Sequence, residues 1–249
     1  MAERPPVDSY LDLVVELLER FRVQQRDALA QAGDVVASTV QAGGLLHLFG
    51  TGHSHMLAEE VFYRAGGLVA VDAMLDARAV LSGGALRSTE TERRPGSAAE
   101  IAALYDLRSG DAGVVISNSG RNPAPVEMAL LMKERGLPVI AVTSLTHARA
   151  ATSATRRGQR LFEVADIVLD TGVPYGDASL SMPGVAYPVG PVSTAVGAAI
   201  MQCLILAAME RLVAAGAEVV NLPSGNVDGI DSSRPRAAMA RIAARVRHL

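Results

Sequence analysis

Residues 50–60 of this chain combine, in one short stretch, residue types that bind phosphate and residue types that move protons. The stretch reads GTGHSHMLAEE and follows an apolar run. Glycines let a backbone come close to an anion, and amide groups at the start of a helix carry partial positive charge without hydrogen-bond partners. We therefore expect Gly52 and Ser54 to bind a phosphate group, although an ordinary strand-to-helix turn capped by serine would show the same pattern.

A second turn of the same character occupies residues 117–123, which read SNSGRNP. It also follows an apolar segment and precedes a predicted helix with proline near its start. Serine, asparagine and glycine are common turn formers, but two such turns at one end of a sheet favour a shared ligand. The residues expected to bind phosphate or sugar hydroxyl groups, here and after the next strand, are Ser117, Asn118, Ser119, Asn122, Thr143 and Ser144.

Two acids and two histidines in and after the first turn are candidates for acid–base chemistry. Removal of a proton next to a carbonyl group requires a carboxylate within hydrogen-bond reach, and Glu59 and Glu60 follow the turn closely. They lie on adjacent faces of the predicted helix, so we expect one of them to face the ligand. His53 and His55 are candidate acids or ring-opening groups. The alternative is a solvated helix face on which His55 and Glu59 form a pair.

The elements that must hold these residues alternate between short apolar strands and helices. Strands are expected at residues 44–50, 68–72, 113–117, 138–143 and 166–170, and helices at residues 9–41, 54–65, 97–105, 123–135, 193–215 and 235–249. Residues 73–96 are expected to form a long loop with little regular structure. Ser97 and Glu100 are expected to form a capping box at the helix that follows this loop.

This alternation predicts a single doubly wound α/β domain with a mainly five-stranded parallel sheet. Such sheets bind ligands at the carboxyl ends of their strands, near the point where the strand order reverses. Functional residues are therefore expected just after Gly50, Asp72, Ser117, Thr143 and Asp170. We expect residues 1–43 to form an N-terminal helical extension, residues 44–220 the ligand-binding domain, and residues 221–249 a C-terminal tail and helix.

Composition narrows the class of protein. The chain has 249 residues, of which 49% are hydrophobic, and a formal net charge of −3. These values favour a folded, soluble protein with neither a nucleic-acid nor a membrane partner, and the single cysteine, Cys203, fits the reducing cytoplasm.

Cofactor sites fit the sequence poorly. His55 stands at the third glycine position of GxGxxG, which argues against a nicotinamide or flavin site. The sole lysine, Lys133, is expected near a helix C-terminus, so neither a Schiff base nor a Walker A loop is expected. No metal is expected either, because two further ligands are not visible beside the histidine and glutamate candidates.

The order strand–GTGHS–helix followed by strand–SNSGRNP–helix resembles the sugar isomerase (SIS) domain family, over roughly residues 40–215. The resemblance implies a flavodoxin-like fold, phosphosugar binding through serines at the two turns, and a homodimer or homotetramer. The second turn of the family commonly reads SxSGxT, and Asn122 stands here in place of the threonine. The stretch HMLAEEVF is similar to the helix of sedoheptulose 7-phosphate isomerase in which Ala-Glu-Glu supplies a catalytic glutamate. This points to Glu60, with Glu59 as the alternative.

The function expected from these observations is an enzyme that acts on an (N-acetyl)amino sugar 6-phosphate. A carboxylate would remove the C2 proton, and the C3 oxygen would then leave, as in a dehydratase or in N-acetylmuramic acid 6-phosphate etherase, a more distant relative with the same fold. The same first step gives aldose–ketose isomerisation if the proton returns to the neighbouring carbon. A non-catalytic phosphosugar sensor is a further alternative, because SIS domains also serve as effector-binding modules in regulators.

Overall fold

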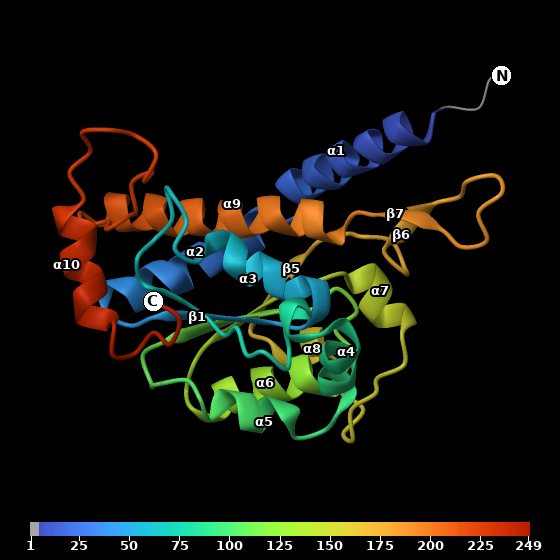
Figure 1. Ribbon diagram of the computed structural model, residues 1–249, viewed down its shortest axis with the longest axis horizontal. Helices are drawn as coiled ribbons and strands as arrows, with labels where there is room; N and C mark the ends of the chain where they lie inside the picture. Colours follow the sequence, from blue (N-terminus) through green and yellow to red (C-terminus); the bar gives the residue numbers. More distant parts are fainter. Residues whose placement is uncertain (1–4) are drawn as a thin grey trace.

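The computed structural model describes residues 5–249 and has a five-stranded sheet in which all neighbouring strands run parallel (Figure 1). The strand order is β2-β1-β3-β4-β5. The strands are β1 (Leu46–Gly50), β2 (Val71–Ala73), β3 (Ala112–Ile116), β4 (Val139–Thr143) and β5 (Ile167–Asp170). β1, β3 and β4 are buried along their full length, as strands covered on both faces should be. The predicted α/β fold is confirmed.

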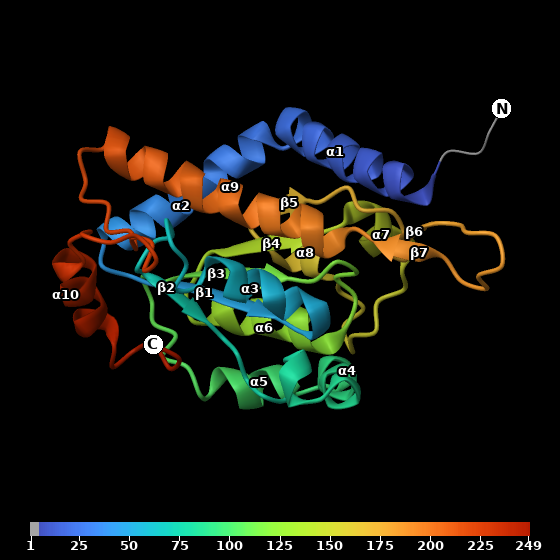
Figure 2. The same cartoon turned by 45° about the horizontal axis from the view of Figure 1, so that its top comes forward.

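Helices cover both faces of the sheet (Figure 2). One face packs against α1 (Pro6–Gln24), α2 (Arg26–Gln41), α3 (His55–Val61) and α9 (Ser193–Ala214). The other packs against α5 (Ser97–Ala102), α6 (Pro123–Glu134) and α8 (Leu161–Val164). Because successive side chains of a strand point to opposite faces, Leu46 and Leu48 of β1 join the first core and Phe49 joins the second.

The strand order reverses between β1 and β3, because the chain leaves β1 toward β2 on one side and continues from β3 toward β4 on the other. The turns at residues 50–55 and 117–122 follow these two strands. They therefore lie beside each other at the carboxyl edge, where open α/β sheets bind their ligands.

The N-terminal helices pack into the core of the sheet. Leu17 and Phe21 of α1 and Val36 of α2 are buried in the same apolar cluster as β1 and α9. α2 approaches α9 closely at Gly33, where an added Cβ would lie 2.9 Å from the Cβ of Ala207. The small residue at this position lets the two helices meet at the distance that their packing requires.

α9 is the helix in the described part of the chain that is long and apolar enough to cross a membrane, judged by length and composition alone. The core helix of a soluble protein passes the same test. Val196, Ile200 and Leu204 of α9 are buried against α2, α3 and the sheet. The apolar sequence of α9 is therefore accounted for by its place in the core.

Residues 73–96 were expected to form a loop, and this prediction is wrong. They contain the short 3₁₀ helix η2 (Leu81–Gly83) and the helix α4 (Ala85–Arg93). The expected capping box is also wrong, because Gly96, with φ +84°, holds the cap position of α5. The Ser97 hydroxyl instead donates to the carbonyls of Thr91 and Arg94, and Glu100 forms an ion pair with Arg94.

Other elements differ from expectation in length or were missed. α3 ends at Val61, earlier than expected, because Phe62 is extended and Tyr63 has φ +49°. The last helix, which was expected to be longer, is α10 (Ser233–Ile242). Neither α7 (Leu145–Ala150) nor the two-stranded hairpin of β6 (Ala178–Leu180) and β7 (Val189–Pro191) was expected from the sequence. The hairpin projects from the body beside α1 (Figure 1).

Candidate functional site

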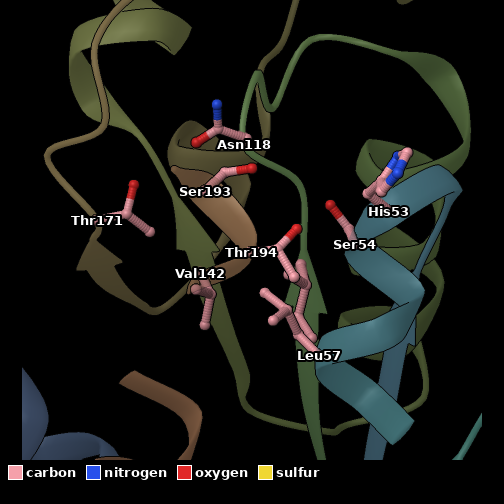
Figure 3. Close-up of a pocket in the computed structure, with 9 residues that line it drawn as sticks. His53, Ser54, Leu57, Asn118, Val142, Thr171, Ser193 and Thr194 are labelled. Carbon is pink, nitrogen blue, oxygen red and sulfur yellow. The ribbon is translucent and has the colours of Figure 1, made fainter. Parts of the chain in front are cut away.

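A cavity opens at the carboxyl edge of the sheet, between α3 and the start of α9 (Figure 3). Figure 3 shows the hydroxyl groups of Ser54 and Thr194 turned toward the same space from these two helices. The lining residues come from the ends of β3, β4 and β5, from the 3₁₀ helix η1 (Gly52–Ser54) that precedes α3, and from α3 and α9. They are His53, Ser54, Leu57, Ile116, Asn118, Val142, Thr171, Ser193 and Thr194. The structure therefore brings His53, Ser54 and Asn118 together at one cavity.

The first turn is shaped by its glycines. A Cβ on Gly50 would lie 2.6 Å from the backbone of Ser54, so the chain can fold back only with glycine at this position. Gly52 has φ +54°, and its amide already donates to the Ala79 carbonyl and to the Ser88 hydroxyl, each at 3.1 Å. The Ser54 hydroxyl makes no capping hydrogen bond. This turn thus presents the side chain of Ser54, rather than the amide of Gly52, to a ligand.

The second turn offers unused hydrogen-bonding groups. Asn118 lines the cavity, and its buried Oδ1 has no partner within residues 5–249. Ser119 is half-buried and forms no hydrogen bond in that part of the chain. The Ser117 hydroxyl accepts from the Gly120 amide at 3.2 Å and so stabilises the turn itself. Gly120 has φ +57°, the left-handed conformation that favours glycine.

Thr143 and Ser144, expected near the ligand, are fully buried beneath the second turn. The Thr143 hydroxyl donates to the Asn118 carbonyl at 3.3 Å, and the Ser144 hydroxyl donates to the Val173 carbonyl at 2.5 Å. Ser144 also caps α7, because its Oγ accepts from the His147 amide at 3.0 Å. In this arrangement both residues hold the turns in place, and neither lines the cavity.

Glu60 lies on the face of α3 that is turned toward α9. Its Oε1 accepts a hydrogen bond from Gln202 of α9 at 3.1 Å, and its side chain is 28% exposed. Between Glu60 and the cavity, Leu57 packs directly against Gly197 of α9. Glu60 therefore shares the seam between the two helices with the cavity but does not line it.

Glu59 and His55 form the pair that the alternative interpretation of this helix predicts. The Nε2 of His55 lies 3.7 Å from Oε1 of Glu59, whose side chain is 49% exposed. The Nδ1 of His55 bonds to the Gly52 carbonyl, so this buried ring stabilises the first turn. Among the described residues that line the cavity, His53 alone has an ionisable side chain. Within the described chain, no group of three or more His, Cys, Asp or Glu residues is placed to hold a metal ion.

The start of α9 contributes lining residues that the sequence did not single out. Ser193 and Thr194 lie in the first turn of this helix, and Thr171 follows β5. Asp177, at φ +69°, accepts from the Ser193 amide at 2.8 Å and from the Ser193 hydroxyl at 2.6 Å. Thr171 was within reach of sequence reasoning, because it stands just after a predicted strand. Ser193 and Thr194 gave only an ordinary helix-start signal.

A carboxylate from α4 lies between the two turns. The Oε1 of Glu92 accepts from the side-chain amide of Asn122, in the second turn, at 2.6 Å. Its Oε2 lies 3.9 Å from the position that a Cβ on Gly52, in the first turn, would occupy. Asn122 was expected to bind phosphate, and its amide instead holds this carboxylate. Sequence reasoning missed Glu92 because it fell in the segment expected to be a loop.

A second cluster of charged groups is buried at the other end of β1. His47 lies between two carboxylates, with Nδ1 2.9 Å from Asp72 and Nε2 3.1 Å from Asp111, and Arg245 donates to Asp111 at 2.6 Å. Burial alone would lower the pKa of His47, but its bonds to Asp111 and Asp72 outweigh burial and raise that pKa. Asp72 therefore belongs to a buried cluster of charged groups away from the cavity.

Comparison with known proteins gives consistent results for sequence and fold. A family model described as the SIS domain matches residues 9–144. The UPF0309 protein lin2794 of Listeria innocua is 40% identical over 225 residues, which cover 90% of this chain and 91% of that protein. The UPF0309 protein SCO4393 of Streptomyces coelicolor is 42% identical over 236 residues and 92% of each chain.

Two solved structures share the fold. A phosphoheptose isomerase from Francisella tularensis superimposes with a TM-score of 0.55 at 16% identity and covers 82% of this chain and 96% of its own. The phosphoheptose isomerase of Neisseria gonorrhoeae gives a TM-score of 0.51 at 17% identity, with 80% and 96% covered. At this level of identity the likeness concerns the arrangement of the elements.

Proposed function

This chain belongs to the SIS-domain family, with UPF0309 proteins as its relatives, and on that premise we propose that it binds a phosphorylated sugar in the cavity between α3 and α9. The observation that carries the proposal is the unused hydrogen-bonding capacity of Asn118, which lines this cavity, and of its neighbour Ser119. Within residues 5–249, Ser119 and the buried Oδ1 of Asn118 have no hydrogen-bond partner. An unsatisfied buried acceptor costs free energy, and a sugar hydroxyl group would satisfy it.

The phosphate is expected between Ser54 and the second turn. Ser54, which lines the cavity, offers a hydroxyl group. Ser119, the neighbour of the lining residue Asn118, offers an amide and a hydroxyl group that have no hydrogen-bond partner within residues 5–249. α9 adds the partial positive charge of a 22-residue helix, whose first amides have no acceptor within the helix. Thr194 lines the cavity at this point. Asp177 neutralises part of this charge, so we expect α9 to make a smaller contribution to phosphate binding than Ser54 and Ser119.

Binding is tested by calorimetry and by ligand-induced shifts of the melting temperature. N-acetylglucosamine 6-phosphate is expected to bind, and N-acetylglucosamine without phosphate is not. Ser54→Ala and Ser119→Ala should each weaken binding about tenfold or more, because a hydrogen bond to a charged group contributes about 1.5–3 kcal/mol. Ser181→Ala, in the exposed hairpin, is the matched control. Equal affinity for the two sugars would contradict the proposal.

The chemistry proposed for this site is removal of the C2 proton of an (N-acetyl)amino sugar 6-phosphate by a carboxylate, followed by departure of the C3 oxygen. His53, the ionisable side chain in the cavity lining, is proposed to protonate the departing or ring oxygen. The resemblance to sedoheptulose 7-phosphate isomerase points to Glu60 as the base, with Glu59 as the alternative. Glu60 is the better placed of the two, because it faces α9 along the seam that the cavity shares. Aldose–ketose isomerisation is the alternative outcome of the same first step.

A non-catalytic sensor is the second candidate function, and one observation favours it. None of the residues that line the cavity in the described chain is a carboxylate. Proton NMR in deuterated water with N-acetylglucosamine 6-phosphate separates the two functions. An enzyme exchanges the C2 proton or forms an unsaturated or isomerised product, and the product distinguishes elimination from isomerisation. Binding without any spectral change would support the sensor.

A cytoplasmic homodimer or homotetramer is also proposed. Apolar side chains remain exposed on α1 and α9, and a second copy of the chain would cover them. They include Val7, Leu11, Val15, Val23, Leu206 and Val213. Light scattering after gel filtration tests this, and Leu11→Glu combined with Leu206→Glu should give monomers. A monomeric wild-type protein would contradict it.

A further inference from the structure

We propose that Glu92 of α4 is the catalytic base of this site, the group that removes the C2 proton. The proposal rests on the proposed function, because it assigns one step of that reaction to a residue. It departs from the expectation that the base lies on α3. Its support is geometric: the carboxylate of Glu92 reaches both turns, through its bond to Asn122 and its approach to Gly52.

α4 is fixed against the first turn by a hydrogen bond one helical turn before Glu92. The Ser88 hydroxyl accepts from the Gly52 amide at 3.1 Å and donates to the Ala79 carbonyl at 2.5 Å, and Ser88 is fully buried. Residues four apart lie on the same face of a helix. Glu92 therefore projects from the face of α4 that Ser88 holds against the turn. The carboxylate is positioned by the fold rather than left on a mobile surface chain.

The two oxygens of Glu92 have different surroundings. Oε1 receives the Asn122 amide at 2.6 Å, which fixes the orientation of the carboxylate. Oε2 is directed toward Gly52 and has no hydrogen-bond partner in the described chain. A base needs one oxygen held and one free to accept a proton, and this arrangement provides both. Asn122 acts here as a positioning residue.

The free oxygen of Glu92 takes the proton from C2, and the electron pair of the C–H bond moves into the adjacent carbonyl to give an enolate. In elimination, that pair then forms the C2–C3 double bond while the C3–O bond breaks, and the departing oxygen takes a proton from His53. In isomerisation, which requires a sugar with a hydroxyl group on C2, protonated His53 gives its proton to the enolate oxygen on C1. The proton carried by Glu92 then returns to C1, while the C2 hydroxyl group loses its proton to His53 and becomes the ketone. No oxidant, reductant or further reactant is required.

No carboxylate of the described chain lines the cavity, but that of Glu92 lies between the two turns beside it. The cavity is bounded by α3 on one side and by α9 on the other, and Glu92 approaches from α4, which packs against η1 (Gly52–Ser54) (Figure 1). A sugar anchored by its phosphate at Ser54 and Ser119 lies between these elements. Glu59 and Glu60 lie beyond Leu57 on α3 and are farther along the helix.

The test is the rate of C2 proton exchange into deuterated water, followed by NMR with the full-length protein and N-acetylglucosamine 6-phosphate. Glu92→Gln keeps an acceptor for Asn122 and removes the base. It should slow exchange at least about a hundredfold, the typical share of a general base, while calorimetric affinity stays within about threefold. Glu90→Gln, on the exposed side of the same helix, is the matched control and should exchange at the wild-type rate.

Chemical rescue separates a catalytic role from a structural one. In Glu92→Ala, added formate should restore part of the exchange, because a small carboxylate can enter the vacated space. Exchange that survives in Glu92→Gln, or that is lost in Glu60→Gln or Glu59→Gln instead, overturns this assignment and leaves the proposed function intact. Loss of affinity in Glu92→Gln together with no rescue by formate also overturns it. A wild-type protein that binds the sugar and never exchanges overturns both the reaction and the role of Glu92.

Discussion

Substitution of Asp111 by asparagine is expected to destabilise the protein by about 3–5 kcal/mol, the range for breaking a buried ion pair. Asp111 accepts four hydrogen bonds: from the amides of Leu45 and Arg108, each at 2.8 Å, from His47 at 3.1 Å and from Arg245 at 2.6 Å. An asparagine can keep the bond from Leu45. Its amide group would then face the other three donors, two of which are charged.

Each charged hydrogen bond contributes about 1.5–3 kcal/mol, so the two charged partners alone account for the expected range. Because whole domains are stable by roughly 5–15 kcal/mol, the loss is a large share of the total. Urea unfolding followed by circular dichroism measures it. Asp106→Asn is the matched control, because Asp106 pairs with the same arginines at the surface and should change stability by less than about 1 kcal/mol. A loss below 1 kcal/mol in Asp111→Asn would refute the view that this cluster is an energetically coupled unit.

Three further changes have defined outcomes. Because the pKa of His47 is raised in the folded protein, protonated His47 contributes its full stabilisation below pH 6.5, and this contribution is lost as pH rises through the folded-state pKa. The free energy of unfolding, measured from pH 6 to 9, should show this decline, and His47→Gln should reduce the dependence on pH. Gly50→Ala places a Cβ 2.6 Å from the Ser54 backbone, so it should cost about 1–3 kcal/mol in thermal unfolding and weaken phosphosugar binding; unchanged affinity would contradict the role of this turn. Asp177→Ala removes the acceptor at the start of α9 and should cost about 1 kcal/mol, while tighter phosphate binding in calorimetry would show that the carboxylate competes with the ligand.

The sheet and the two turns could be predicted from the sequence because their signals are local. β1 and β4 are apolar runs with all residues buried, and glycine or polar turn formers follow the runs. Parallel strands place the segments after them at one edge whatever the details of the helices. Ser54 and Asn118, which follow two of these strands, both line the cavity.

The rest depends on contacts between distant segments. α4 contains few apolar residues and follows Gly83 and Gly84, so its sequence resembles a loop. It is held by the bond between Ser88 and Gly52, which no local pattern reveals. Whether a polar residue in a turn faces a ligand or the protein is likewise set by its partners. The hydroxyl groups of Ser117 and Thr143 form hydrogen bonds within the turn, whereas Ser119 has no hydrogen-bond partner in residues 5–249.

The burial of a charged pair between neighbouring strands also fixes how the edge of the sheet is aligned. His47 of β1 stands directly opposite Asp72 of β2, a strand of only three residues. A shift of the pairing by one residue would place a leucine against Asp72 and leave His47 facing apolar side chains. The pair thus favours a single register of β2 against β1. The two positions can change only jointly, so across related sequences a replacement at one should accompany a replacement at the other.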